Sequence, residues 1–349
     1  MSVLKKSLFK KARDIKVGVV GYGGTFNMGR QHLEQMQKAG MTPVAVAELD
    51  ESRLAVATAD FPGISTFNTV DAMLKKSDVN LVVIITPHNT HAPLAMKCLR
   101  AGRHVVCEKP LAIKTKEVDK MIAAARAAGV VLSTYHNRHW DGWIIDAVQR
   151  VKKERQIGDI IRIDCRMGSR SNPGDWWRAS RTMSGGLLYD WGVHLIEYCL
   201  QLIDSHVTQV CGFTHSGYWA PHTRWKNDTI EDDAQAVLRF DSGQWVTLSI
   251  SNIESNPRAG FLEITGTEGS YIIDWQNYTL IVRNGTHERL VRGPHSQSLH
   301  DRFYKNLRDH LINREPLIIT ADWSRRPIHF IEMAYLSAKQ GRAVPTRYG

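Results

Sequence analysis

The feature that most constrains the fold is an alternation of short apolar runs with longer segments of helical period between residues 15 and 135. The runs are rich in β-branched residues, and segments such as 29–40 and 91–102 separate them. Strands that are apolar on both faces and joined by helices form a parallel sheet covered on both sides. Gly40 and Gly102 stand where helix C-caps favour glycine. We therefore predict a doubly wound α/β domain. Its six strands are expected at 15–20, 42–48, 64–67, 80–86, 103–109 and 130–135.

The pattern changes after residue 135. A helical stretch over 142–156 leads to alternating segments, and two of the turns between them, Asp241-Ser242-Gly243 and Asn284-Gly285, are typical of β-hairpins. We predict a second, α+β domain with a large, mostly antiparallel open sheet that helices cover on one face. A final helix is expected over 326–341. The predicted division is an N-terminal arm at 1–14, a dinucleotide-binding Rossmann domain at 15–138, and a substrate-binding and oligomerisation domain at 139–349. The last helix is free to pack back on the Rossmann domain.

Composition excludes several classes of protein. A chain of 349 residues fits two domains, and it holds no run of about 18 apolar residues, so we expect no membrane span. The basic N-terminus lacks the apolar run of a signal peptide. Five cysteines without a CxxC pair indicate buried thiols in a reducing compartment, and we expect a cytoplasmic protein. The net charge of +10 is scattered, which favours anionic small molecules over nucleic acid.

A glycine turn follows the first apolar run directly. Gly21-Tyr22-Gly23-Gly24 precedes a helix that begins near Met28. Backbone N–H groups and the helix dipole at such a turn form a site for a pyrophosphate. The usual spacing fails because Phe26 stands where the third glycine belongs. We interpret 25–27 as an insertion and give the third role to Gly29; the alternative is that these glycines only make a turn.

Other cofactor contacts follow from strand ends. Glu48 ends the second run, where a carboxylate accepts hydrogen bonds from the adenosine ribose and repels a 2′-phosphate. This favours NAD over NADP, although the nearby Arg53 softens the preference. The loop after the fourth run is expected beside the nicotinamide. The predicted cofactor contacts are Gly21, Gly23, Gly24, Thr25, Phe26, Asn27, Met28, Glu48, Arg53, Thr86, Pro87, His88, His91, Glu108, Lys109 and Asn137. His88 and His91 lack a third ligand at the spacing of a metal site, so we expect no bound metal.

Four segments together resemble one known family: the glycine turn and residues 86–112, 184–202 and 231–243. The combination of Glu108-Lys109-Pro110 with the later DWGVH segment is specific. The chain resembles the glucose–fructose oxidoreductase, inositol dehydrogenase and rhizopine-catabolism (Gfo/Idh/MocA) family over nearly its whole length. The resemblance implies a Rossmann domain, an open C-terminal sheet that builds homodimers or homotetramers, and redox chemistry at a secondary alcohol of a sugar or polyol.

The resemblance also places three residues at the reacting carbon: Lys109, Asp190 and His194. Asp190 and His194 share one face of a predicted helix. A histidine can take a hydroxyl proton at neutral pH, so we assign the base role to His194 and electrostatic stabilisation to Lys109; the reverse assignment stays open. The structural alternatives are a strand-end lysine, a helix N-cap at Asp190 and a buried core histidine.

Substrate contacts are expected in loops that face the same site. Besides the three residues at the reacting carbon, the candidates are Tyr135, Arg138, Trp176, Trp177 and Arg178, since aromatic rings stack on the apolar faces of sugars. The tryptophans could instead fill the domain interface. The predicted function is an NAD-dependent dehydrogenase acting on a secondary alcohol of a sugar, glycoside or inositol-type polyol. The alternatives are an NAD-assisted glycoside hydrolase and a non-catalytic NAD-binding protein.

Overall fold

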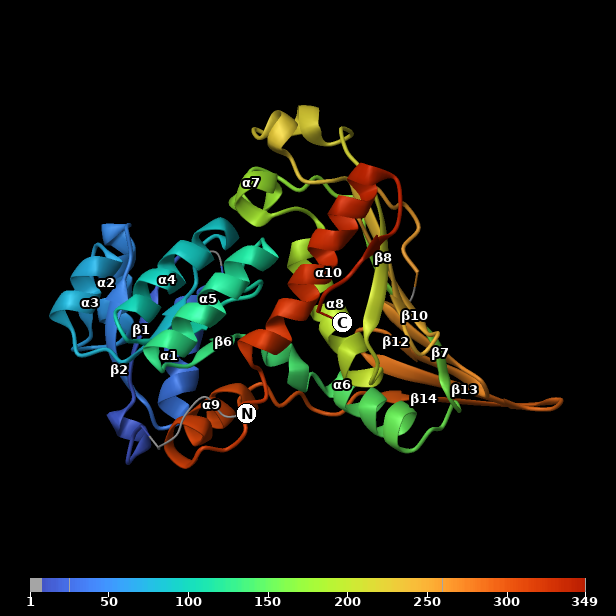
Figure 1. Cartoon of the computed structure of the whole chain (residues 1–349), viewed down its shortest axis with the longest axis horizontal. Helices are drawn as coiled ribbons and strands as arrows, with labels where there is room; N and C mark the ends of the chain where they lie inside the picture. Colours follow the sequence, from blue (N-terminus) through green and yellow to red (C-terminus); the bar gives the residue numbers. More distant parts are fainter. Residues whose placement is uncertain (1–7, 25, 259, 349) are drawn as a thin grey trace. The chain divides into compact units, whose positions relative to one another are not determined.

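The computed structural model describes residues 8–24, 26–258 and 260–348 (Figure 1). Its contacts divide the chain into two compact units. The first holds residues 1–137 and 301–325, and the second holds 138–300 and 326–349. This division differs from the predicted one at residues 301–325. That segment carries helix α9 (Arg302–Asn313), whose apolar face, including Phe303 and Leu307, is buried.

Sheet A, in the first unit, is entirely parallel and has the strand order β3-β2-β1-β4-β5-β6. This is the order of a dinucleotide-binding doubly wound fold, so the prediction for this half is confirmed. Its strands are β1 (Lys16–Val20), β2 (Thr42–Ala47), β3 (Ser65–Phe67), β4 (Leu81–Ile84), β5 (His104–Cys107) and β6 (Leu132–Thr134). The helices between them are α1 (Met28–Lys38), α2 (Glu51–Asp60), α3 (Val70–Lys76), α4 (His91–Arg100) and α5 (Thr115–Ala128).

The central strands of sheet A are buried on both faces. Every residue of β4 and of β5 is buried, as the continuous apolar runs predict for a parallel sheet between helices. Gly40 and Gly102 follow α1 and α4 with φ of +84° and +71°, the left-handed conformation that glycine adopts most easily. Both predicted helix ends are therefore confirmed.

Sheet B, in the second unit, has nine strands in the order β14-β13-β12-β11-β7-β10-β9-β8-β15. Only β7 and β10 pair in parallel, and all other neighbours are antiparallel. The strands are β7 (Ile160–Gly168), β8 (Val207–His215), β9 (Asp233–Phe240), β10 (Trp245–Ser251), β11 (Leu262–Gly266), β12 (Gly269–Ile273), β13 (Asn277–Asn284), β14 (His287–Pro294) and β15 (Val344–Pro345). The predicted mostly antiparallel sheet is confirmed, and the parallel pair was not foreseen.

Helices cover one face of sheet B (Figure 1). The helices of this region are α6 (Gly142–Ala147), a π-helical turn (Val148–Lys153), α7 (Arg181–Ser184), α8 (Leu188–Leu202) and α10 (Ala321–Gln340). A Cβ at Gly192 of α8 would lie 3.2 Å from Leu248 of β10, so the glycine lets this helix approach the sheet closely. The predicted hairpin turns join β9 to β10 and β13 to β14, with positive φ at Gly243 and Gly285. Both hairpin predictions are confirmed.

Helix α10 begins five residues earlier than predicted and contains Pro327. The predicted start near Arg326 leaves the residues before this proline in the preceding segment. Thr320 provides the earlier start: its side-chain oxygen accepts a hydrogen bond from the N–H of Trp323 at 3.0 Å. Pro327 lies inside the helix, where its missing N–H removes one intrahelical hydrogen bond, and the helix continues through it to Gln340. Within the described ranges, no helix is both long and apolar enough to cross a bilayer.

Candidate active site

The glycine turn lies where the order of sheet A reverses. Strand β1 pairs with β2 on one side and with β4 on the other, and the turn follows β1. Gly21 has a φ of +98°, and a Cβ there would lie 2.5 Å from the carbonyl oxygen of Ile85. No other residue type fits this position. Dinucleotides bind in doubly wound folds at such a switch point, outside the carboxyl ends of the strands.

The insertion after Gly24 changes how helix α1 begins. Phe26 is exposed, and Asn27 adopts the left-handed conformation with a φ of +48° immediately before α1. A Cβ at Gly29 would lie 2.6 Å from the Tyr22 ring and 2.9 Å from the Gly21 carbonyl oxygen. Gly29 thus permits the close packing of helix on turn that the third glycine of a regular motif permits. Thr25, a predicted cofactor contact, lies outside the described residues.

Glu48 and Arg53 both hold the backbone of the glycine turn. The Glu48 carboxylate accepts hydrogen bonds from the backbone N–H groups of Tyr22 and Leu49, both at 2.6 Å. The Arg53 Nε donates to the carbonyl oxygen of Tyr22 at 2.9 Å, and its guanidinium lies beside Gly24. Tyr22 is therefore a central residue of the turn that sequence reasoning missed. Its position between two glycines gave no signal for this role.

The loop after β4 is tied to the segment after β5. The His91 ring lies 2.7 Å from the carbonyl oxygen of Pro110 and 2.8 Å from that of Thr86. His91 is fully buried, so its predicted contact with the cofactor can only be indirect. His88 is buried next to it, with ring centroids 5.7 Å apart. The Lys109–Pro110 peptide bond is cis. His91 thus fixes the loop on which the predicted nicotinamide contacts stand.

Glu108 precedes Lys109 at the carboxyl end of β5. Its carboxylate lies 3.0 Å from His32 Nε2 and accepts a hydrogen bond from the backbone N–H of Lys109, also at 3.0 Å. Burial raises the pKa of the Glu108 carboxyl, but the hydrogen bond from His32 and the nearby charge of Lys109 outweigh this and hold the pKa below its usual range. Glu108 is therefore a buried anion next to Lys109.

Tyr135 follows β6 but does not present its side chain as predicted. It is 3% exposed, and its hydroxyl donates a hydrogen bond to Gln35 at 2.6 Å. Its ring packs against His32 with centroids 4.3 Å apart. The prediction that Tyr135 contacts the substrate is replaced by a role in the core of the first unit, because an apolar ring gains most from burial. Asn137 begins the short 3-10 helix that follows.

Helix α8 of the second unit carries two of the predicted catalytic residues. Asp190 lies in its first turn and His194 one turn later, so both share one face of the helix as predicted. The helix N-cap is Leu187, which removes the N-cap alternative for Asp190. The partial positive charge of the helix N-terminus favours an ionised carboxylate there. His194 is buried, with its ring 5.7 Å from that of Trp191.

The loop before α7 brings three predicted substrate contacts to Asp190. The Arg178 Nε lies 3.6 Å from Asp190 Oδ1. Its guanidinium carbon lies 4.9 Å from the ring centroid of Trp176 and 4.6 Å from that of Trp177. The two tryptophans thus hold the arginine by cation–π contacts. Arg138 lies 4.7 Å from the centroid of the Trp191 ring.

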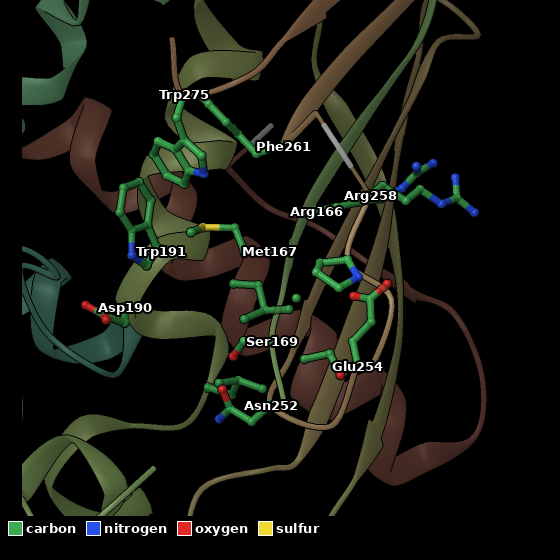
Figure 2. A pocket seen from close by; sticks show the side chains of 15 residues that line it. Arg166, Met167, Ser169, Asp190, Trp191, Asn252, Glu254, Arg258, Phe261 and Trp275 are labelled. Atoms are coloured by element: carbon green, nitrogen blue, oxygen red, sulfur yellow. The ribbon is translucent and has the colours of Figure 1, made fainter. Parts of the chain in front are cut away.

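A cavity of about 530 Å³ opens next to Asp190 (Figure 2). Aromatic side chains form one part of its wall: the ring centroid of Trp275 lies 5.5 Å from that of Trp191 and 4.5 Å from that of Phe261. Trp275 is 52% exposed although three rings, those of Trp143, Trp191 and Phe261, contact it. Polar side chains, among them Ser169, Asn252 and Glu254, line other parts of it together with apolar ones such as Met167 and Ile250. An exposed aromatic wall facing hydroxyl, amide and carboxylate groups can bind a ligand with apolar faces and hydroxyl edges.

The sequence did not predict these cavity residues. Trp191 follows Asp190 in the sequence, and this adjacency to a predicted catalytic residue was an available signal. Trp275 follows Asp274, whose carboxylate accepts hydrogen bonds from the backbone N–H groups of Gln276 and Asn277 in the turn between β12 and β13. A tryptophan in such a polar turn is an available signal for a binding residue. Nothing in the sequence marks Asn252.

Comparison with known proteins agrees with this geometry. Residues 15–136 match the model of the GFO_IDH_MocA oxidoreductase family with an NAD-binding Rossmann fold, and residues 145–272 match the model of its C-terminal domain. The chain belongs to the Gfo/Idh/MocA family. It is therefore an enzyme, a nicotinamide-dependent oxidoreductase, as predicted.

Three relatives illustrate the range of this family. Scyllo-inositol 2-dehydrogenase (NADP(+)) of Bacillus subtilis is 24% identical over 96% of this chain and 97% of its own. Myo-inositol 2-dehydrogenase of Thermotoga maritima is 26% identical over 77% and 78%. The structure of levoglucosan dehydrogenase in complex with NADH and levoglucosan superposes with a TM-score of 0.80 and 18% identity, covering 95% of this chain and 99% of the other. This last likeness shows the fold alone.

Proposed function

We propose that this family member is a dehydrogenase that transfers hydride between nicotinamide and a secondary alcohol of a sugar, glycoside or inositol-type polyol. The observation that carries the proposal is the cavity beside Asp190, which sets an aromatic wall against polar side chains. The names of the relatives point the same way, since two are inositol dehydrogenases and one structure holds levoglucosan.

Each of the three catalytic candidates has a distinct role in this proposal. His194 accepts the proton of the reacting hydroxyl, because imidazole is the side chain best suited to that task at neutral pH. Lys109 stabilises the developing alkoxide with its ammonium group. Asp190, paired with Arg178, orients the substrate hydroxyl and favours the charged form of His194. The nicotinamide, when bound, supplies the hydride acceptor.

The residues of the glycine turn fit a dinucleotide. Gly21 has no room for a side chain, and the turn leads into the N-terminus of α1, so backbone N–H groups can approach a pyrophosphate. We propose NAD as the preferred cofactor, because the Glu48 carboxylate repels a 2′-phosphate. Arg53 lies beside the same turn and limits this preference. The family model is described as NAD-binding and one relative is named for NADP, so both cofactors occur among the names of similar proteins.

We also propose that the enzyme is a homodimer or homotetramer that associates through the face of sheet B opposite its helices. Phe213 of β8 is 61% exposed and Leu290 of β14 is 60% exposed. Phe213 alternates along its strand with residues such as Gly212, which lies against α10, so it points to the opposite face. Light scattering in solution should give the mass of two or four chains. The mass of a single chain would contradict this assignment.

The experiment that tests the function is a panel of inositols, monosaccharides and glycosides with NAD and then with NADP, followed by the absorbance of reduced nicotinamide. We expect sustained reduction with at least one polyol or sugar. Cleavage of glycosides without net cofactor reduction, in protein that retains NAD, would favour a glycoside hydrolase instead. Cofactor binding without turnover of any compound would favour a non-catalytic protein.

A further inference from the structure

Three side chains from separate elements of the first unit form a hydrogen-bonded chain that ends at Lys109. Tyr304 of α9 places its hydroxyl 2.5 Å from Nδ1 of His32 in α1. Nε2 of His32 lies 3.0 Å from Glu108, and the other oxygen of this carboxylate accepts the backbone N–H of Lys109 at 3.0 Å. The His32 and Tyr304 side chains are fully buried, and that of Glu108 is 14% exposed.

The proton positions in this chain follow from donor and acceptor chemistry. An ionised carboxylate only accepts hydrogen bonds, so the proton between His32 and Glu108 belongs to Nε2. In the neutral ring, Nδ1 then accepts the hydroxyl proton of Tyr304. Burial raises the pKa of Tyr304 well above its usual range and keeps this proton in place. The carboxylate thus sets the tautomer of the neutral ring, and the tyrosine hydroxyl supports it by donating to Nδ1.

Helix α1 thus reaches the catalytic lysine through a side chain that touches neither substrate nor reacting atoms. We propose that His32 is a positioning residue, which with Tyr304 holds the Glu108 carboxylate ionised and oriented against Lys109. This inference relies on the proposed function only for the role of Lys109. No assigned role of the glycine turn or of the catalytic residues involves His32 or Tyr304.

The consequence of losing His32 follows from the balance of effects at Glu108. Burial alone raises the pKa of this carboxyl, and the hydrogen bond from His32 is the largest effect that opposes it. Without the donor, the carboxylate takes up a proton at higher pH. Lys109 then loses its anionic neighbour, and the neutral carboxyl group is a weaker acceptor for its backbone N–H. The remaining groups that face His32 are Tyr304 and the ring of Tyr135, whose hydroxyl is bonded to Gln35.

The same unit offers a matched control in His104, a second buried histidine. Its Nδ1 accepts a hydrogen bond from the backbone N–H of Val131 at 2.9 Å. Burial, with a smaller contribution from the charge of His310, lowers the pKa of His104 to about 4. His104 lies on β5, the strand that leads to Glu108, but no hydrogen bond joins it to that carboxylate. His104→Leu therefore removes a buried imidazole and leaves the chain to Lys109 intact.

The first test measures the titration of Glu108 in the full chain by carbon NMR, with the resonance assigned from Glu108→Gln. We expect the wild-type midpoint below that of an ordinary glutamate and a rise of about one pH unit or more in His32→Leu. His32→Gln, which keeps an N–H donor, should recover most of the shift, and His104→Leu should show none. Because this readout needs no turnover, it stands whether or not the proposed reaction is found. An unchanged midpoint in His32→Leu would overturn the proposal.

The second test separates positioning from general loss of structure, with a substrate identified in the panel. We expect kcat to fall about tenfold or more in His32→Leu while the Kd of the cofactor changes less than about twofold, and His32→Gln to recover most of the loss. An equal loss in His104→Leu would overturn the proposal. Tyr304→Phe removes a single oxygen and preserves the packing, so it serves if His32→Leu does not fold. Tyr304→Phe should raise the titration midpoint of Glu108 by a smaller amount than His32→Leu. An unchanged midpoint would count against the proposed hydrogen-bonded chain.

Discussion

The proposed cofactor site in the first unit and the proposed substrate site in the second are built from different parts of the polypeptide. The cofactor site depends on the backbone of the glycine turn. This turn has a positive φ at Gly21, close packing against α1 at Gly29, and N–H groups that donate to Glu48. The substrate site depends on side chains, with Trp191, Phe261 and Trp275 around a cavity of about 530 Å³. The pyrophosphate group is identical in all dinucleotide cofactors, whereas substrates differ and each requires different side chains. A site built from backbone therefore requires a recognisable sequence motif, whereas the residues of a substrate site are scattered along the sequence.

The largest expected effect is at Lys109, to which the proposal gives the stabilisation of the alkoxide. Lys109→Ala should lower turnover by about a thousandfold or more, because it removes the group that stabilises the alkoxide. Cofactor affinity should change less than about threefold, since the glycine turn is untouched. Steady-state kinetics and fluorescence titration of the cofactor measure the two quantities. Near-normal turnover would refute the catalytic role.

Gly29→Ala is expected to damage the cofactor side alone. The new methyl group would meet the Tyr22 ring and the Gly21 carbonyl oxygen, so α1 must move away from the turn. We expect a loss of about 1–3 kcal/mol in the free energy of unfolding and a weakening of the cofactor by about tenfold or more. Gly23→Ala is the steric comparison, because nothing lies within 4 Å of a Cβ there. An equal loss of stability in both variants would show that contact at Gly29 is not the cause.

Trp275→Ala is expected to damage the substrate side alone. The indole forms much of the exposed aromatic wall, and its loss should raise KM by about fivefold to tenfold while leaving cofactor binding unchanged. Trp275→Phe should recover part of the effect. Steady-state kinetics at varied substrate concentration measure KM and kcat separately. A change in kcat alone, with KM constant, would place Trp275 outside the binding wall.

The smallest expected effect is a change in cofactor preference. Glu48→Ala should weaken NAD about fivefold more than NADP, because the carboxylate that repels the 2′-phosphate is lost. Arg53→Ala is the control for general loosening, since Arg53 also holds the Tyr22 backbone. It should not shift the preference toward NADP. Competitive titration with both cofactors gives the ratio, and a ratio that Glu48→Ala leaves constant would remove the ribose assignment.

The same contrast explains what the sequence could predict. Continuous apolar runs and glycines with required φ values are local signals, and they identified the strands of sheet A, two helix ends and two hairpins. Asp190 and His194 lie on one face of α8 as predicted, because a spacing of four residues fixes their relation on a helix. The irregular turn was interpretable because only one later glycine, Gly29, stands near enough to replace the missing one.

What escaped prediction depends on contacts between distant residues. Strand β7 pairs in parallel with β10, a segment far along the chain, and no local pattern encodes that choice. The segment 301–325 joins the first unit through the apolar face of α9, which could have packed on either unit. Four of the five cysteines are buried as expected, and Cys211 is half-buried near the open edge of sheet B. His32 gave no signal because its importance arises only where Glu108 and Tyr304 meet it.

The most direct test of the account follows the hydrogen itself. The enzyme is incubated with the oxidised cofactor and an active polyol or sugar that carries deuterium on its carbinol carbons, and the reduced cofactor is analysed by mass spectrometry. Hydride transfer from a secondary alcohol predicts one deuterium per reduced nicotinamide and a slower reaction than with the unlabelled compound. Reduced cofactor without deuterium, or conversion of the substrate without reduction of the cofactor, would contradict hydride transfer from a secondary alcohol.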